Sequence, residues 1–495
     1  MKEKLQKLDY LNIVMTLVAI LYAILKIEGI KNTIISVIII IFASLFTNYV
    51  LKMMRRKNIK LEYIYLIFAI VIGIGYLIAL PVVKIPDSRN DYLRSLEISN
   101  LNITTTKKGT KVGRYYSTNI DKVYRLENKS GVKYKDINLI KDRELNDEKK
   151  FYTYATKSLY AFVCYIPQAI GVGIGKLLNM SIYNQTILGK IFNYALFVLL
   201  VFTAIKYIPV KKELVFFLAM LPMTVQEALS LSPDSMTIAT SIFFVSMLIY
   251  FKTSKEMFNM KWKIILFIIS ILLSMCKIVY LPLCFLILLI PKDKYNSKKE
   301  KYIYCSILLL TVVVLNLTWL RYSSRYLVAF LGRSNSSLQL KFILGNPIKY
   351  CFIIFNTIDL YSIVWLEQLL GLSIGIYSIP TFSVYIISSA FLLILYTIRN
   401  DKSKKQFLFN NIEKGYTLLI ALGTFILICT SLYMQWTEPY LNYIDGIQGR
   451  YFIPLVLLIS MVFMTKEKDI KYKNTITYSV LINVAALVAV VASFL

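Results

Sequence analysis

The chain has 495 residues, of which 57% are hydrophobic and only 17% are charged. An ordinary soluble protein carries roughly 25% charged residues, so this composition excludes a soluble enzyme. Lys and Arg outnumber Asp and Glu by 57 to 28, which gives a formal charge of +29. We expect no nucleic-acid partner, because the topology of a membrane protein accounts for such an excess.

Apolar segments of about 20 residues recur along nearly the whole sequence, and each is long enough to cross a bilayer core of roughly 30 Å. The sequence therefore predicts an all-α polytopic membrane protein. The complete absence of His excludes a His base, a His-assisted nucleophile and a His-ligated metal. The six Cys lie in apolar segments without a CxxC pair, and we interpret them as packing residues.

Basic segments predict the orientation in the membrane, because short loops rich in Lys and Arg stay in the cytoplasm. These segments are the N-terminus, 52–60, 206–213, 252–263, 291–301, 399–414 and 465–474. The polar stretch 84–157 is then external. The same argument places the N-terminus in the cytoplasm and the C-terminus outside.

Two cytoplasmic segments must be joined by an even number of membrane spans. This condition predicts about 13 transmembrane helices. These include 10–27, 32–51, 61–83, 184–205, 378–398, 413–432, about 450–464 and 475–494. Residues 158–183 are predicted to be a juxtamembrane or re-entrant segment, and 321–377 to be external or re-entrant. Residues 262–290 are expected to form a hairpin of two short helices with Lys277 at the turn.

This topology divides the chain into an extra N-terminal hairpin (1–60), a transmembrane core (61–464) and a C-terminal helix (465–495). Within the external loop, the region 104–150 contains VGRYYSTNI and DKVYRLENKSG. These runs predict either a small β-hairpin insertion or a loop.

The external loop opens with IPDSRNDYLRSLEIS. Pro86 ends the preceding helix, and a short helix after it would place Asp87 and Asp91 on one face, with Glu97 further along. Such a carboxylate at the membrane surface suits a general base acting on a hydroxyl, or a ligand of a divalent cation such as Mg²⁺ or Mn²⁺. The alternative is a Pro-Asp helix cap followed by solvated charges.

A second acidic segment is LSPDSMTIA, where Asp234 begins a helix that returns into the membrane. A helix cap explains this arrangement equally well. Glu227 is expected at membrane depth, where a carboxylate is energetically expensive and usually faces a cavity.

Cations are expected on the same side. Lys277 has no carboxylate near it in sequence, so either it binds an anion such as a lipid phosphate or its side chain extends to the outer surface. In GIQGRYFIP, Arg450 and Tyr451 lie at the mouth of a span, and a guanidinium suits bidentate phosphate binding. Arg325 belongs to a second basic external region, where simple surface charge is the alternative.

No DxD motif occurs, and no cytoplasmic segment is large enough to hold a nucleotide. A nucleotide-linked donor is therefore not expected.

Several segments, in this order, resemble the bacterial membrane family known as domain of unknown function 2142 (DUF2142), which belongs to the GT-C glycosyltransferase superfamily. They follow Pro86-Asp87 and are YIPQAIGVGIGKLL (165–178), LGKIFN (188–193), LPMTVQEALSLSPDS (221–235), KIVYLPL (277–283) and QGRYFIP (448–454). The resemblance covers about residues 80 to 465.

One departure concerns the first loop. The family pattern is Pro-Pro-Asp-Glu followed three residues later by His, whereas this chain has Ile85, Ser88 and Asp91 at the first, fourth and His positions. Asp87 carries over. Either Asp91 or Glu97 substitutes for the missing groups, or the chemistry is altered or lost.

The resemblance implies a GT-C-like fold and a glycosyltransferase of the bacterial cytoplasmic membrane. It would move a sugar from a polyprenyl-phosphate donor to a glycan or lipid acceptor on the outer face. In this hypothesis Asp87 deprotonates the acceptor or holds a divalent cation, Asp91 assists, and Lys277, Arg450 and Arg325 bind the lipid phosphate. The secondary candidates are Asp234, Glu227, Glu97 and Tyr451. The alternatives are a carrier or flippase for a lipid-linked or anionic solute, and a donor-binding scaffold without activity.

Overall fold

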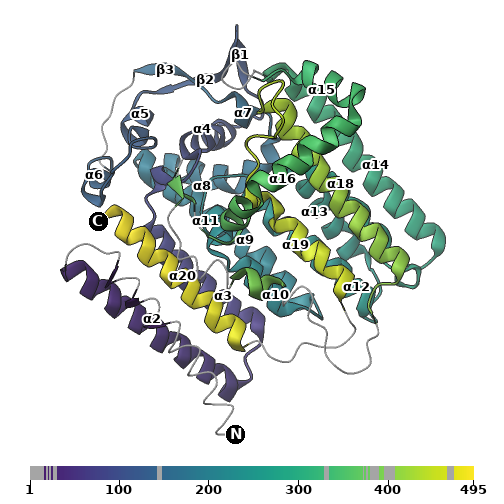
Figure 1. The fold of residues 1–495 in the computed structure, drawn as a ribbon, viewed down its shortest axis with the longest axis horizontal. Coiled ribbons are helices and arrows are strands. Elements are labelled where there is room, and N and C mark those ends of the chain that lie inside the picture. The colour runs from purple at the N-terminus through teal and green to yellow at the C-terminus, as the bar shows by residue number, and fades with distance from the viewer. Residues whose placement is uncertain are drawn as a thin grey trace.

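The computed structural model describes residues 30–141, 148–327, 334–371, 389–394, 407–464 and 473–495, and the isolated positions 16, 17, 20, 21, 24, 25, 373, 374, 377 and 378. The described chain is predominantly helical, as Figure 1 shows, which confirms the predicted all-α class. Most of the predicted span 10–27 lies outside the described residues, and its described positions 16, 17, 20, 21, 24 and 25 are helical. Of the predicted span 378–398, the described residues are 389–394, which are helical, and 378, which ends a short strand.

Eight described helices are long and apolar enough to cross a membrane. These segments are Ser36–Met53, Leu61–Ala79, Ile182–Tyr207, Asp234–Thr253, Lys298–Tyr326, Pro347–Leu370, Asn411–Gln435 and Thr475–Phe494. Three shorter apolar helical segments accompany them, at Phe162–Leu177, Ile278–Leu289 and Gly449–Phe463. The chain is thus a multi-pass membrane protein.

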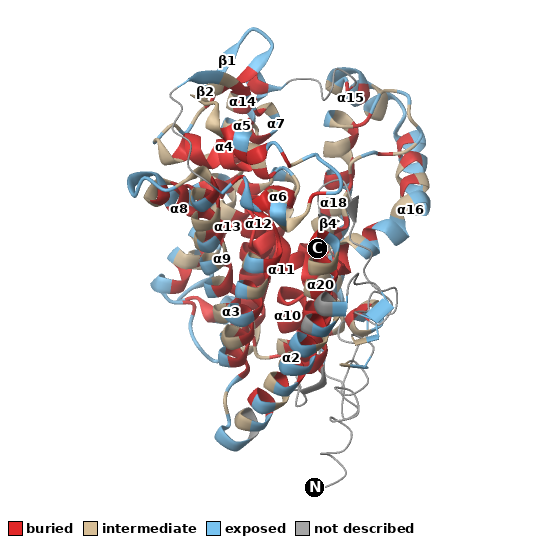
Figure 2. Ribbon diagram, turned by 90° about the vertical axis from the view of Figure 1, so that its left-hand side faces the viewer, coloured by how far each residue is buried: buried red, intermediate tan, exposed pale blue. Residues whose placement is uncertain are grey.

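The helices of the N-terminal half are α2 (Ile30–Lys57), α3 (Leu61–Ala79), η1 (Val82–Lys84), α4 (Ser88–Ser99), α5 (Asn119–Tyr124), α6 (Tyr134–Asn138), α7 (Ala155–Ser158), η2 (Phe162–Tyr165), α8 (Ile166–Leu177), α9 (Ile182–Tyr207), α10 (Lys212–Ala219), α11 (Pro222–Ala228) and α12 (Asp234–Thr253). Helix α9 packs against α3, α8 and α12. In Figure 2, α4 lies between the strands at the top and the long helices below, and α8 lies beneath α4.

The remaining helices are α13 (Met260–Cys276), η3 (Ile278–Leu289), η4 (Lys292–Lys294), α14 (Lys298–Ser323), η5 (Ser324–Tyr326), α15 (Ser336–Gly345), α16 (Pro347–Leu370), α18 (Asn411–Gln435), η7 (Gly449–Phe452), α19 (Ile453–Ser460), η8 (Met461–Phe463) and α20 (Lys473–Phe494). Two short helices, α13 and η3, pack together and meet at Lys277, as the sequence predicts. Pro282 lies inside η3, which is 3₁₀ rather than α-helical.

The region 321–377, predicted to be external or re-entrant, contains a long helix that sequence reasoning did not anticipate. Helix α16 has 24 residues and is itself long and apolar enough to cross a membrane. The helix contains the charged residues Asp359 and Glu367, which interrupt its apolar pattern, so an argument based on hydropathy and on the number of crossings did not identify it. A two-stranded pairing of β4 (Ser373–Ile374) with β5 (Tyr377–Ser378) follows it.

The region 104–150 holds a three-stranded antiparallel sheet formed by β1 (Thr106–Lys108), β2 (Lys111–Ser117) and β3 (Lys149–Thr153), in that order. The run VGRYYS lies in β2, as expected for a hairpin. The second run is not a strand: its first residues form α5, and β3 comes from further along the chain.

Two apolar clusters stabilise these layers. The larger joins the long helices, with Phe68, Phe216 and Leu481 essentially inaccessible. A smaller one joins α4, α5 and the sheet, and includes Tyr92 and Tyr152. The sheet is therefore packed onto the helical body.

Candidate functional site

Asp87 initiates α4 in an unusual backbone conformation. Its φ is +59°, in the left-handed region that Asp tolerates better than most residues. Its side chain makes no capping hydrogen bond, so the simple helix-cap interpretation is wrong for this carboxylate. It accepts instead from Lys157 Nζ, which lies 3.2 Å from Oδ2.

Lys157 bridges the two acids of the first loop. Its ammonium also lies 3.0 Å from Asp91 Oδ1, and Tyr165 donates its hydroxyl to the same oxygen at 2.8 Å. Asp91 is 1% exposed, whereas the Asp87 side chain is 57% exposed. The predicted shared face of Asp87 and Asp91 is therefore present, and one cation lies between the two carboxylates.

These contacts set different proton affinities for the two acids. The nearby Lys157 ammonium lowers the pKa of Asp87, which opposes the effect of burial. Burial raises the pKa of Asp91 to about 6, although Lys157 partly counteracts it. Burial alone would lower the pKa of Lys157, but Asp87 and Asp91 raise it. At neutral pH this group is thus two carboxylates held by one ammonium.

A second ionic group lies at the start of α12. The Asp234 carboxylate binds Lys277 through Oδ1 and accepts from Arg450 Nε at 2.8 Å through Oδ2. Arg450 also approaches Glu227, with 3.6 Å between Nη1 and Oε1. The idea that Lys277 lacks a protein partner is therefore wrong, because the fold brings Asp234 against it from a distant part of the chain.

The backbone around Arg450 is fixed by close packing. A Cβ atom at Gly449 would lie 1.8 Å from the backbone oxygen of Trp365, so only Gly permits this contact between η7 and α16. Gly446 has a φ of +80°, and a Cβ there would meet the ring of Trp436. The ring of Tyr451 lies 3.9 Å from Lys277 Nζ.

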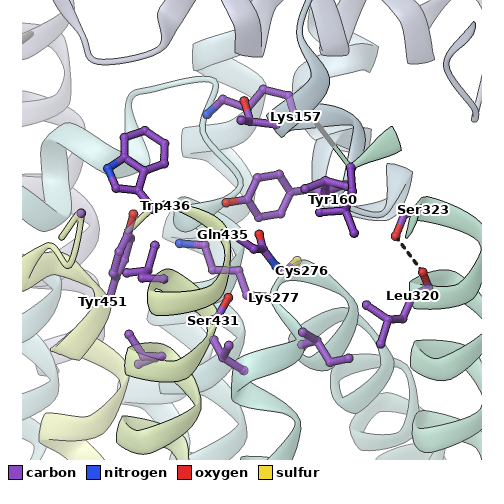
Figure 3. Close-up of a pocket in the computed structure, with 18 of the residues that line it drawn as sticks. Lys157, Tyr160, Cys276, Lys277, Leu320, Ser323, Ser431, Gln435, Trp436 and Tyr451 are labelled. Atoms are coloured by element: carbon purple, nitrogen blue, oxygen red, sulfur yellow. Dashed lines mark hydrogen bonds between the residues drawn. The ribbon is translucent and has the colours of Figure 1, made fainter. Parts of the chain in front are cut away.

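Both ionic groups border one cavity of about 550 Å³. Its lining includes Asp87 and Lys157 from the first group and Lys277 and Arg450 from the second. In Figure 3, Lys277 and Tyr160 extend toward the same space, which Tyr451 and Trp436 border. Apolar side chains line another part of the wall, among them Leu159, Met275, Ile278, Val279, Leu320 and Leu432.

The other predicted site residues take different positions. Asp91, Asp234 and Glu227 lie behind the wall and contact the residues that line it. Glu97 is fully buried away from the cavity, where it binds Arg94 and accepts from Arg114 Nε at 2.6 Å.

Arg325 also does not line the cavity. Its guanidinium lies over the Tyr322 ring at 3.8 Å, and its Nε donates to the Tyr322 carbonyl. Its neighbours Ser324 and Leu327 do line the cavity, so Arg325 is at the rim.

The cavity residues that sequence reasoning missed include Lys157, Tyr160, Trp436 and Gln448. Trp436 carried the best available signal, since the chain has only four Trp and this one follows a predicted span. Gln448 lies two residues before Arg450, and its buried Oε1 has no hydrogen-bond partner among the described residues. Lys157 and Tyr160 carried no local signal.

The acids do not make a metal site in this arrangement. In the described part of the chain, no group of three or more Cys, Asp or Glu side chains is placed to hold an ion. The position between Asp87 and Asp91 is filled by the Lys157 ammonium. These residues therefore do not fit a divalent cation.

Comparison with known proteins gives one result. The model of a family described as "Predicted membrane protein (DUF2142)" matches residues 70–459, a range that contains both ionic groups and the whole cavity lining. Neither curated proteins nor solved structures give a match.

Proposed function

The chain belongs to this DUF2142 family of predicted membrane proteins, and on that premise we propose that it is a membrane glycosyltransferase with a polyprenyl-phosphate-linked sugar as donor. The acceptor is a glycan or lipid of the bacterial cell envelope at the outer face of the cytoplasmic membrane. The observation that carries the proposal is that a carboxylate, Asp87, borders the same cavity as two cations, Lys277 and Arg450.

The chemistry requires both kinds of group. Asp87 takes the proton of the acceptor hydroxyl as that oxygen bonds to the anomeric carbon. The bond between the anomeric carbon and the phosphate oxygen breaks, and the lipid phosphate leaves with an additional negative charge. Lys277 and Arg450 stabilise that charge.

The two cations keep donors for this purpose. A Lys ammonium has three N–H groups and an Arg guanidinium has five, whereas Asp234 takes one contact from each residue. Arg450 can therefore also donate to a phosphate oxygen. The apolar wall near Lys277 suits the first isoprene units of a lipid attached to that phosphate.

Asp87 is held ready for this role by Lys157, whose ammonium keeps the carboxylate ionised. We include no divalent cation in the reaction, because that ammonium fills the space between the two acids.

The test is mass spectrometry of lipid-linked sugars and envelope glycans from a deletion strain carrying wild type, Asp87→Asn or Asp121→Asn. Asp121 is a matched control, since it pairs with Lys150 and does not line the cavity. We expect deletion to remove a glycan modification, wild type and Asp121→Asn to restore it, and Asp87→Asn to fail at normal protein level. An active Asp87→Asn protein would refute the assigned base.

A carrier for a lipid-linked or anionic solute is the second candidate. It is favoured by Glu227, a buried acid whose Oε2 has no hydrogen-bond partner within the described residues. A carrier predicts that deletion changes no glycan structure and that the purified protein moves a labelled solute across vesicles. Glycan loss without vesicle transport excludes it.

A further inference from the structure

The outer face of the β1–β2–β3 sheet differs from the rest of the region around it. Residues on one face of a sheet alternate along each strand and are paired across strands. The registers Lys108 with Lys111, Tyr115 with Phe151 and Ser117 with Lys149 therefore place these six side chains on one face. Strand residues of this face include three Lys, two aromatics and no Asp or Glu.

The opposite face is packed onto the protein. Val112 and Tyr152 are each 1% exposed in the smaller apolar cluster, and Arg114 binds Glu97. The outer face, in contrast, exposes Lys108, Lys111 and Lys149. The inner face thus packs onto the protein, with Lys107 and Lys150 exposed on it, whereas the outer face exposes all three of its Lys.

Two aromatic rings lie at the centre of the outer face. Tyr115 is 53% exposed, and its ring packs edge to face against Phe151 with 5.2 Å between centroids. Lys108 Nζ lies 4.5 Å from the Tyr115 centroid and 5.9 Å from that of Phe151. Exposed rings beside cations can receive the apolar face of a sugar or polyol unit while the cations bind anionic groups.

The sheet adjoins the rim of the cavity. Lys107 Nζ donates to the Arg325 carbonyl at 2.7 Å, and the Tyr326 hydroxyl donates to the Thr105 carbonyl at 2.7 Å. The next residue, Leu327, lines the cavity. The sheet therefore lies next to the rim, where Arg325 is exposed, and Lys107, which makes this contact, belongs to the inner face.

Membrane topology does not explain this basic face. The rule that concentrates Lys and Arg in short cytoplasmic loops gives no reason for three exposed Lys on an external insertion. In Figures 1 and 2 the strands lie at the top of the molecule, with α3, α9 and α12 below them. This position favours a ligand outside the bilayer over the headgroups of the surrounding membrane.

We propose that the outer face of this sheet binds an anionic glycopolymer, a chain of sugar or polyol units bearing phosphodiester or carboxylate groups, and presents it to the cavity as acceptor. The second half of this statement rests on the proposed transferase function. The first half does not, because binding to the sheet needs neither donor nor turnover.

The experiment uses the full chain in nanodiscs of zwitterionic phosphatidylcholine and a fluorescent poly(glycerol phosphate) chain as probe. Binding is measured by anisotropy for wild type, Lys108→Gln/Lys111→Gln and Tyr115→Ala. The matched control is Lys129→Gln/Lys135→Gln, which removes two exposed charges from the same insertion away from the sheet. All these side chains are exposed, so folding should be unaffected.

We expect the sheet double variant to weaken binding about fivefold or more, from the usual contribution of two exposed ion pairs. Tyr115→Ala should weaken it, the control should change it less than about twofold, and neutral dextran should not bind. Added salt should weaken wild-type binding, since exposed charges are screened. Asp87→Asn should bind the probe like wild type.

Three results would overturn the proposal: no binding by wild type, equal losses in the sheet and control variants, or equally strong competition by phosphatidylglycerol vesicles at matched phosphate. The last would assign the face to a lipid surface. If the proposed transferase function fails while the sheet still binds the probe selectively, polymer binding stands and only its role as acceptor falls.

Discussion

Replacing Asp234 with Asn should strongly destabilise the protein, because this carboxylate holds two cations inside the fold. The Asp234 side chain is 7% exposed, and those of Lys277 and Arg450 are 12% and 11% exposed. Removing one partner of a buried ion pair costs about 3–5 kcal/mol. Water in the adjoining cavity screens part of this effect, so we expect a loss of about 3 kcal/mol.

The measurement is equilibrium unfolding in mixed micelles, followed by tryptophan fluorescence. Asp293→Asn is the matched control, since the Asp293 side chain is 69% exposed and 3.7 Å from Lys294. An exposed pair of this kind contributes about 0–1 kcal/mol. The difference between the two Asp variants therefore isolates the effect of burial.

A double-mutant cycle completes the test. In Asp234→Asn/Lys277→Gln, the Lys277 cation is removed together with its partner, so no uncompensated charge remains at that position. The double variant should therefore lose less free energy of unfolding than the sum of the two single variants. A coupling free energy of about 1.5 kcal/mol or more is expected for such neighbours. An Asp234→Asn loss no larger than that of Asp293→Asn, or simple additivity with Lys277→Gln, would refute the ionic interpretation.

Three further results follow from the geometry. Burial raises the pKa of Asp91 to about 6 from a usual 3.8, so wild type should lose about 3 kcal/mol of stability as pH rises from about 3 to above 6, and unfolding of Asp91→Asn across that range should not show this loss. Gly449→Ala should lower the unfolding midpoint, by about 3 kcal/mol in free energy, because its Cβ would overlap the Trp365 carbonyl oxygen. Gly423→Ala, in a helix with open space around it, should instead add about 0.5–1 kcal/mol. Glycan transfer should persist in EDTA, and its loss with recovery on adding Mg²⁺ would contradict the metal-free reaction.

Local sequence patterns predicted much of the fold. A long apolar run specifies a membrane helix through its own composition, so most spans were found to within a few residues. Helix α16 was missed because Asp359 and Glu367 interrupt its apolar pattern. Its ends nevertheless carry local signals, since Pro347 lies in its first turn and Gly371 directly follows its last residue.

The candidate site, like the fold, was predicted where a local pattern determines it and missed where distant parts of the chain meet. The four-residue spacing of Asp87 and Asp91 predicted a shared helix face, because helix geometry alone determines it. The partner of those acids, Lys157, lies beyond β3, and only the folding of the insertion brings it to α4. Lys277 gave the opposite error: it was isolated in sequence, yet it pairs with Asp234 on a neighbouring helix.

The pairing of Lys277 and Arg450 with acids bears directly on the proposed reaction. Asp234 binds both cations and Glu227 lies near Arg450, so a donor phosphodiester with one negative charge gains less from them in the ground state than it would from two free cations. The leaving phosphate acquires a further charge as its bond to the sugar breaks, and the N–H groups of both cations are then positioned to receive it. Stabilisation that grows during bond cleavage accelerates the reaction, whereas equally tight binding of the resting donor would not. Two cations paired with acids, beside an ionised base, are thus better suited to the proposed reaction than two free cations.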